Sequence, residues 1–86
     1  MTFEGSVITE QNVTFGIIIV KPYVLNDVSA KQQMELFGKR AFGNIPIILM
    51  AQNSVGTPTY YGRKDIVQFL SHVHPSRIPW KKYTLS

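Results

Sequence analysis

The stretch VTFGIIIVKPYVL, residues 13–25, decides the fold that we expect for this chain. Phe15 to Val20 form an unbroken apolar run within it. A strand made of such a run needs apolar cover on both faces, as in the centre of a sheet. Lys21 and Pro22 end or bend the strand, because proline cannot donate a hydrogen bond to a neighbouring strand. The stretch therefore predicts an inner strand.

A second stretch of the same kind, IPIILMAQ at residues 45–52, predicts another inner strand. Pro46 stands at its start, where proline is tolerated. Two such strands must be kept dry on both sides. We therefore expect each face of the sheet to be covered by a helix, by the C-terminal arm or by another subunit.

Two further strands accompany the inner ones. FEGSVITE at residues 3–10 alternates roughly in polarity, which is typical of a half-buried strand. The turn residues Gln11 and Asn12 join it to the strand that follows, so the two are expected to form a hairpin. TPTYYG at residues 57–62 predicts a fourth strand, and Pro58 favours an edge position for it.

An amphipathic helix is expected over residues 26–43, between the two inner strands. Ser29 and Gln32 fit a capping box at its start, and Gly43 is a C-terminal stop. Gly38 lies beside the apolar stripe and allows close approach to a sheet. The stripe consists of Ala30, Met34, Phe37 and Ala41.

A second helix is expected between Asp65, as its N-cap, and Pro75, because the residue before a proline is pushed out of the helical conformation. Its apolar face consists of Ile66, Phe69, Leu70 and Val73. The sequence thus predicts an α+β fold: a four-stranded mixed sheet in ββαββα order, two helices and an ordered C-terminal arm. We expect a single domain over residues 1–86, with a core over 1–74 and a basic, aromatic arm over 75–86.

Residues 44–74 resemble the last third of a thioredoxin-like domain. The shared features are a proline that opens an apolar strand, a glycine turn, a short antiparallel strand, a further glycine and an amphipathic helix. The resemblance implies that Pro46 takes the place of the cis proline beside that family's redox dithiol. Because the chain has no cysteine, the family's chemistry does not carry over, and the likeness concerns shape alone.

Charged residues make up 16% of the chain, below the usual ~25%. A surface poor in charge is often partly hidden in a partner, and a second copy of the chain is the simplest such partner. We therefore expect a homodimer. Leu36 projects from the polar face of the first helix and is the candidate residue for self-association.

The net charge of +4 lies entirely in the last part of the chain. Four cations balance four carboxylates in residues 1–62, whereas five cations face one carboxylate in residues 63–86. This asymmetry predicts an anionic partner for the C-terminal part, with a solvated basic tail as the alternative. The candidate residues for binding a macromolecule are Tyr60, Tyr61, Arg63, Lys64, Arg77, Trp80, Lys81, Lys82 and Tyr83.

Two segments contain these candidates. The motif YYGRKD, residues 60–65, places a glycine and two cations before a helix, an arrangement that suits a phosphate. Asp65 as N-cap would occupy the same N–H groups and repel an anion, so an ordinary strand-to-helix turn is the alternative. In the arm, rings and cations alternate as single-stranded nucleic acid binding requires. The same residues also suit a lid over the protein's own core or a contact with another chain.

The sequence specifies no reaction. The absence of cysteine excludes disulfides, thiol catalysis and cysteine-based zinc sites. His72 and His74 do not share a helix face, so one helical turn cannot chelate a metal with both. No catalytic or nucleotide-binding motif is present. We expect no metal and no cofactor.

The cellular setting follows from two further absences. The first ten residues lack the basic start and apolar stretch of a secretory signal. The longest strongly apolar run falls far short of the ~20 residues that cross a membrane. We therefore expect a cytoplasmic protein without membrane contact.

The preferred function is a small non-catalytic interaction module that binds another protein and self-associates. One alternative is a nucleic-acid-binding protein that uses the basic and aromatic residues of the C-terminal part. The other is a small enzyme that uses His72 or His74. Catalysis is the less favoured class, because no titratable groups are paired along the sequence.

Overall fold

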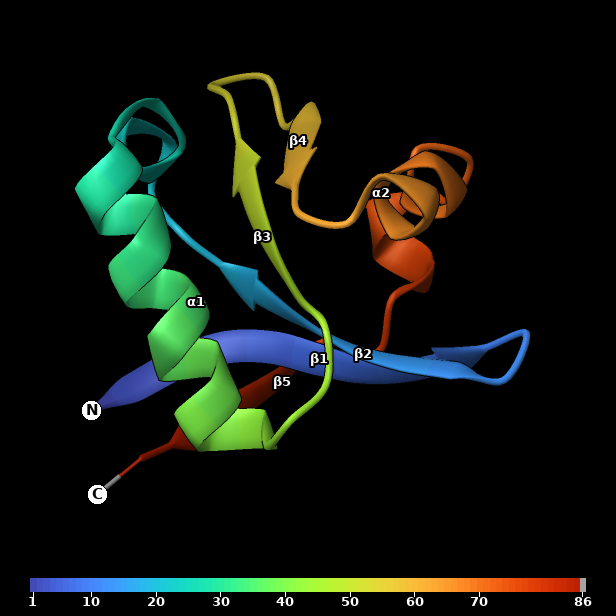
Figure 1. The fold of residues 1–86 in the computed structure, drawn as a ribbon. Helices are drawn as coiled ribbons and strands as arrows, with labels where there is room; N and C mark the ends of the chain where they lie inside the picture. The colour runs from blue at the N-terminus through green and yellow to red at the C-terminus, as the bar shows by residue number, and fades with distance from the viewer. Residues whose placement is uncertain (86) are drawn as a thin grey trace.

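Five strands form one mixed sheet in the computed structural model, which describes residues 1–85 (Figure 1). Their order across the sheet is β4-β3-β2-β1-β5. β2 and β3 run parallel, and the other neighbouring strands run antiparallel. The strands are β1 (Thr2–Glu10), β2 (Val13–Ile19), β3 (Ile47–Gln52), β4 (Pro58–Tyr61) and β5 (Lys81–Thr84).

Two α-helices cover the two faces of this sheet. α1 (Val28–Phe42) carries the chain from β2 to β3, after the 3-10 turn η1 (Pro22–Asn26). α2 (Lys64–Leu70) follows β4, and the 3-10 turn η2 (Pro75–Arg77) leads on to β5. The helices lie on opposite sides of the sheet, which we call the α1 face and the α2 face (Figure 1).

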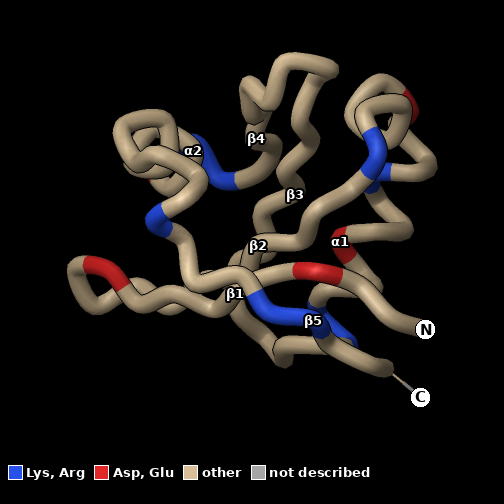
Figure 2. Tube along the Cα trace, turned by 180° about the vertical axis from the view of Figure 1, so that it is seen from behind, with Lys and Arg blue, Asp and Glu red and all other residues tan. Residues whose placement is uncertain are grey.

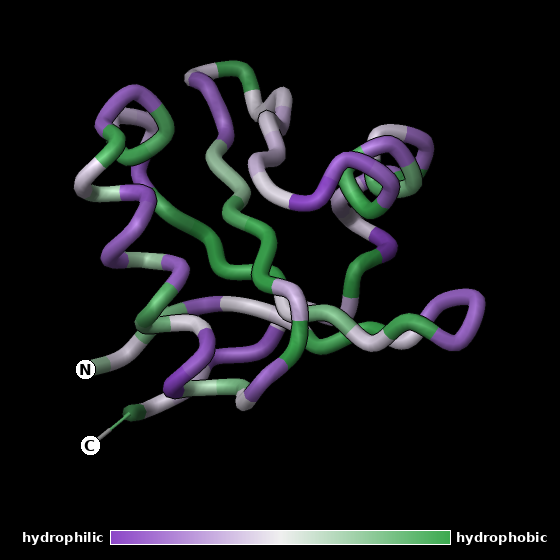
Figure 3. Tube along the Cα trace, viewed as in Figure 1, coloured by the Kyte–Doolittle hydropathy of each residue, from purple (hydrophilic) through white to green (hydrophobic). Residues whose placement is uncertain are grey.

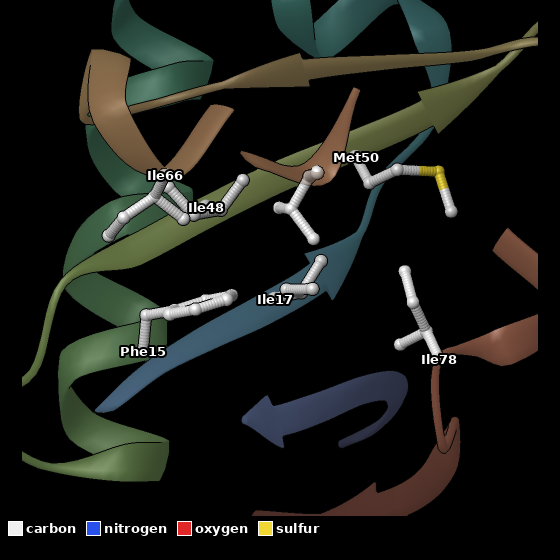
Figure 4. Packing of buried hydrophobic residues seen from close by; sticks show 7 residues of the cluster. Phe15, Ile17, Ile48, Met50, Ile66 and Ile78 are labelled. Carbon is white, nitrogen blue, oxygen red and sulfur yellow. The ribbon is translucent and has the colours of Figure 1, made fainter. Parts of the chain in front are cut away.

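The α2 face is filled from both inner strands (Figure 4). Phe15 and Ile17 of β2 lie beside Ile48 and Met50 of β3, and all four are at most 1% exposed. Each such side chain stabilises the fold by about 1.5–3 kcal/mol when it is fully buried. The cover comes from α2 and from the segment before β5, through Ile66, Leu70 and Ile78.

The α1 face is equally dry. Ile18 and Leu49 are fully buried there under α1 and η1. α1 approaches closely at Gly38, where a Cβ atom would lie 2.6 Å from Cγ2 of Ile47 and 2.9 Å from Cδ1 of Ile18. The predicted close approach at this glycine is thus confirmed. One chain covers both faces with its own helices and arm, so this cover requires no second subunit.

The inner position of β2 and β3 follows from their composition. Figure 3 shows both strands as hydrophobic along most of their length, whereas the turn between β1 and β2 is hydrophilic. That turn holds Gln11 and Asn12 with positive φ angles of 51° and 67°. Two successive left-handed residues are typical of the tight turns that join antiparallel strands. The hairpin and its turn were therefore predicted correctly.

The prediction of four strands was wrong, because residues 81–84 of the arm form β5 and make the element order ββαββαβ. β5 pairs with the start of β1, placing Tyr83 opposite Phe3 and Lys82 opposite Glu4. The chain ends continue this pairing, since the Met1 ammonium group donates to Leu85 O at 2.9 Å and Leu85 N–H donates to Met1 O at 2.8 Å. A strand of four residues with two lysines has little apolar signal of its own.

The start of α1 also differs from prediction. Asp27 is the N-cap, and its side chain accepts a hydrogen bond from Ala30 N at 3.1 Å. The expected capping box of Ser29 and Gln32 is therefore wrong. The 3-10 turn before the helix brings Asp27 into extended geometry, with φ −130° and ψ 112°, which aims its carboxylate at the first helical turn. The predicted stop at Gly43 is confirmed, with φ 90°.

α2 is displaced at both of its ends. Arg63 takes the N-cap position without a side-chain cap, and Asp65 lies in the first turn, so the prediction of Asp65 as N-cap was wrong. The helix ends at Leu70, well before Pro75. After Leu70 the backbone forms hydrogen bonds of the 3-10 type, between residues three apart, and His72 N–H donates to Phe69 O at 3.1 Å.

Two further expectations concern the peptide bond before Pro46 and the crossing of a membrane. The resemblance to a thioredoxin-like domain implies a cis bond before Pro46, but no peptide bond in residues 1–85 is cis. Within the same residues, neither helix is both long and apolar enough to cross a membrane.

Candidate functional site

The outer edge of β4 has main-chain groups that point away from the sheet. The direction of the main-chain groups along β3 identifies the outward-facing residues of β4. Val20 N–H donates to Met50 O at 2.8 Å, so the main chain of Met50 faces β2. Successive residues of a strand direct their main-chain groups to opposite sides. Leu49 and Ala51 therefore face β4.

The partners of these two residues are Tyr61 and Thr59, whose main chains consequently face β3. Tyr60 lies between Thr59 and Tyr61, and Pro58 precedes Thr59. The main-chain groups of Pro58 and Tyr60 therefore point away from β3, toward the open edge of the sheet. Apart from bonds within helices and strands, no backbone hydrogen bond described for residues 1–85 involves either residue. The outward edge thus offers the N–H and C=O of Tyr60 and the C=O of Pro58.

The two edges of the sheet differ in chemistry. β5 has Lys81 and Lys82, both exposed, and lysine on an edge strand is a common way to discourage pairing with another chain. β4 contains no charged residue. Within the strand itself, Pro58 disfavours pairing, because it lacks an N–H group. The predicted edge position of this strand is confirmed.

Three of the grooves that border β4 bear on its outer edge. The edge groove, about 410 Å³, runs between β4 and α2 and is lined by Tyr60, Tyr61, Gly62, Lys64, Val67, Gln68 and Ser71. The α1 groove, about 450 Å³, lies on the α1 face and is lined by Glu35, Lys39, Pro46, Ile47, Tyr61, Gly62, Arg63 and Lys64. The histidine groove, about 530 Å³, lies on the α2 face between Thr57, Pro58 and Tyr60 on one side and residues 67 and 70–75 on the other.

Tyr60 and Tyr61 have different surroundings. Tyr61 is 39% exposed, and Nζ of Lys31 lies 4.3 Å from the centre of its ring, a cation–π contact. Tyr60 is partly buried, and this burial raises the pKa of its hydroxyl. The hydroxyl oxygen is itself buried and has no hydrogen-bond partner in the described part of the chain. Such an unpaired group lowers stability.

Arg63 and Asp65 neutralise each other at the turn before α2. Nε and Nη2 of Arg63 donate to the two carboxylate oxygens of Asp65, each at 2.8 Å. The hydrogen bond from Arg63 is the main cause that lowers the pKa of Asp65 to about 2. Of the two cations in the predicted phosphate motif, Arg63 is therefore occupied, whereas Lys64 has no ion pair within residues 1–85.

The aromatic residues of the arm pack on the protein's own core. Trp80 lies against the buried cluster of the α2 face, and its Nε1–H donates to Pro75 O at 2.9 Å. Tyr83 stacks on Phe3 with ring centres 5.4 Å apart, and its ring meets the edge of Phe42 at 5.0 Å on the α1 face. The two rings are thus on opposite faces of the sheet.

The cations of the arm point into solvent instead. Arg77, Lys81 and Lys82 are all exposed. Figure 2 shows basic segments on β5, at the start of α2 and near α1, with an acidic segment of β1 beside β5. The structure therefore does not bring the predicted rings and cations of the arm together on one surface.

The two histidines form only local hydrogen bonds. Nδ1 of His72 lies 2.9 Å from Gln68 O, so His72 contacts one carbonyl near the end of α2. Nδ1 of His74 accepts from Ser76 N–H at 3.1 Å and caps η2. In residues 1–85 no hydrogen bond joins either ring to a carboxylate, and no three potential metal ligands cluster.

Of the predicted binding residues, Tyr60, Tyr61, Arg63 and Lys64 surround the β4 edge. Lys31 and Lys39 of α1 were not among the predicted residues, although they complete the basic side of this edge. Their spacing was the available signal, because residues 31, 35 and 39 share one stripe of a helix. Leu36 lies outside this group and is 64% exposed.

No family model matches this chain, and no curated protein and no solved structure matches it.

Proposed function

We propose that the protein is a non-catalytic interaction module that binds an extended segment of another protein along the outer edge of β4. The carrying observation is the set of outward main-chain groups of Pro58 and Tyr60, on an uncharged edge strand bordered by grooves. Addition of a strand to such an edge gives affinity through main-chain hydrogen bonds and specificity through pockets for alternate side chains.

The geometry of the edge limits how such a segment binds. A paired strand runs about 4.8 Å from its neighbour, and the edge groove provides space beside β4 on the side of α2. Because Pro58 has no N–H, the edge supplies three hydrogen-bonding groups, each contributing about 0.5–1.5 kcal/mol. Main-chain pairing alone therefore gives weak binding, and the grooves must supply the rest of the affinity.

The test uses hydrogen exchange at two neighbouring amides. Peptides selected from a displayed random library are added to isotope-labelled protein. We expect the Tyr60 amide to exchange rapidly in the free protein and at least tenfold more slowly with a bound peptide. Thr59 is the internal control, because its amide already faces β3 and should be protected in both states. A peptide that binds while Tyr60 keeps its fast exchange uses another surface and refutes the proposal.

Self-association through Leu36 is the second part of the proposal. The low charged fraction of 16% supports it, as does the 64% exposure of this leucine on the outer side of α1. The need to cover an open sheet face no longer supports it, because α2 and the arm cover that face. The nucleic-acid alternative is weaker, since Trp80 and Tyr83 pack inward on opposite faces.

A further inference from the structure

The α1 side of the β4 edge is basic. Lys39 and Lys64 line the α1 groove, and Lys31 lies on the ring of Tyr61 at the same groove. Within the described residues, Glu35 is the only carboxylate that lines it. Arg63 adds no net charge here, because its pair with Asp65 is neutral. Three lysines therefore oppose one carboxylate on this side.

The α2 side of the same edge carries much less charge, because Lys64, which borders both sides, is the one charged residue in the described lining of the edge groove. Tyr60 and Val67 line both the edge groove and the histidine groove, and Pro58 and Leu70 continue the latter. The described lining of the histidine groove contains no Lys, Arg, Asp or Glu. The two sides of one short strand thus present different chemistry to whatever pairs with it.

A strand added to β4 places its side chains alternately on these two sides. We infer that the segment recognised by β4 alternates acidic and apolar residues. Its carboxylates lie beside Lys31, Lys39 and Lys64, and its apolar side chains lie against Tyr60 and Val67. This inference rests on the proposed function and names the chemistry of its partner.

Charge also disfavours a second copy as the occupant of this edge. Two β4 strands paired across a twofold axis would bring the same three lysines of each copy close together. β4 contributes no carboxylate to offset them, and like charges at an interface disfavour pairing. Self-association at Leu36 is unaffected, because that residue lies elsewhere on α1.

The test compares labelled synthetic peptides by fluorescence polarisation at low salt. One alternates valine with glutamate, a second alternates valine with lysine, and a third has the composition of the first with its glutamates in one block. We expect the alternating glutamate peptide to bind at least about tenfold more tightly than either of the others, with affinity falling as salt rises. Equal affinity of the block peptide would show that alternation is not recognised and would overturn the inference.

Matched variants show whether the peptide binds at this surface or is attracted by the net positive charge of the whole protein. Lys64→Gln and Lys39→Gln should each weaken binding of the alternating glutamate peptide about two- to fivefold, the usual effect of one exposed ion pair. Lys82→Gln, the same change on β5, should leave affinity unchanged. An equal loss in all three variants would reduce the effect to net charge and overturn the inference.

The outcomes also distinguish this inference from the proposed function. If both charge types of peptide bind equally and both slow exchange of the Tyr60 amide, the edge binds strands but has no acidic preference, and only the inference fails. If no peptide slows that exchange, the proposed function fails and takes the inference with it. A labelled oligothymidine that binds more tightly than every peptide, without protecting Tyr60, would favour a nucleic-acid partner and overturn both.

Discussion

Trp80 anchors the arm to the α2 face, and its removal should lower stability strongly. Full burial of a tryptophan removes about 200 Å² of surface from water, which at about 25 cal/mol per Å² corresponds to about 5 kcal/mol. Trp80 is only partly buried, so a share of this value is already lost to solvent. Its hydrogen bond to Pro75 O contributes about 1 kcal/mol more. We expect Trp80→Ala to lower the free energy of unfolding by about 3 kcal/mol.

Two companion variants separate the contribution of the ring from that of the hydrogen bond. Trp80→Phe keeps most of the ring contact but loses the Nε1–H donor, so we expect a loss of about 1–2 kcal/mol. Tyr23→Ala removes an aromatic side chain that is 64% exposed and should change stability by less than about 0.5 kcal/mol. Urea unfolding followed by circular dichroism measures all three.

Thermal melting provides a second reading of the same variants. A domain of this size loses about 4–8 °C in Tm for each kcal/mol, so Trp80→Ala should melt at least about 12 °C below the natural protein. A melting temperature within a degree of the natural protein would show that Trp80 does not hold the arm on the core. Equal losses for Trp80→Ala and Trp80→Phe would show that the hydrogen bond, and not ring burial, supplies the stability.

Three shorter predictions test other features. Tyr60→Phe removes a buried hydroxyl without a described partner, so the free energy of unfolding should stay equal or rise by up to about 1 kcal/mol; a clear loss would reveal a partner for this group. The pKa of Asp65 is lowered to about 2 from a reference value of 3.8, so its stabilisation is present above the unfolded-state pKa and is lost as the pH falls toward 2. Asp65→Asn should therefore flatten the fall in stability between about pH 4 and pH 2 in urea titrations, and an unchanged slope would count against the pair with Arg63. Leu36→Lys should convert a dimer into a monomer in sedimentation equilibrium, and a natural protein that is monomeric at high concentration would end the proposal of self-association at this leucine.

The parts of the fold that were predicted depend on local or strongly apolar signals. The two isoleucine-rich stretches were correctly assigned as inner strands, because only a covered position accommodates a run such as residues 17–20. Gln11 and Asn12 identified the hairpin turn, and Gly43 the end of α1. Each of these signals lies within a few residues of the structure that it specifies.

The fifth strand depends on contacts that the local sequence does not contain. β5 pairs with β1 across almost the whole chain, with Thr84 opposite Thr2. The residues Lys81 to Thr84 alone are as typical of a solvated tail as of an edge strand. The helix caps failed for a related reason, since the 3-10 turn after β2 shifts the start of α1 and makes Asp27 its cap.

The candidate site was predicted in part. Tyr61 and Lys64 were identified from the motif at the start of α2. The grouping with Trp80 and Tyr83 was not found, because successive residues of an extended chain face opposite sides of the sheet and these two rings lie an odd number of residues apart. Lys31 and Lys39 join the site only because α1 packs across the inner strands and reaches β4. Such proximity follows from tertiary packing and not from sequence spacing.

The contrast between the two edges bears on how selective this molecule is. β5 is protected by its lysines and joined to the N-terminus at the chain ends, whereas β4 itself contains no charged residue and one proline. An edge protected this lightly would accept many strands if main-chain pairing dominated the affinity. Pro58 reduces the available main-chain groups to three, so side-chain fit decides which segment stays bound. The unequal sides of β4, basic toward α1 and much less charged toward α2, are therefore expected to select the partner and to disfavour pairing of the open edge with its own copy.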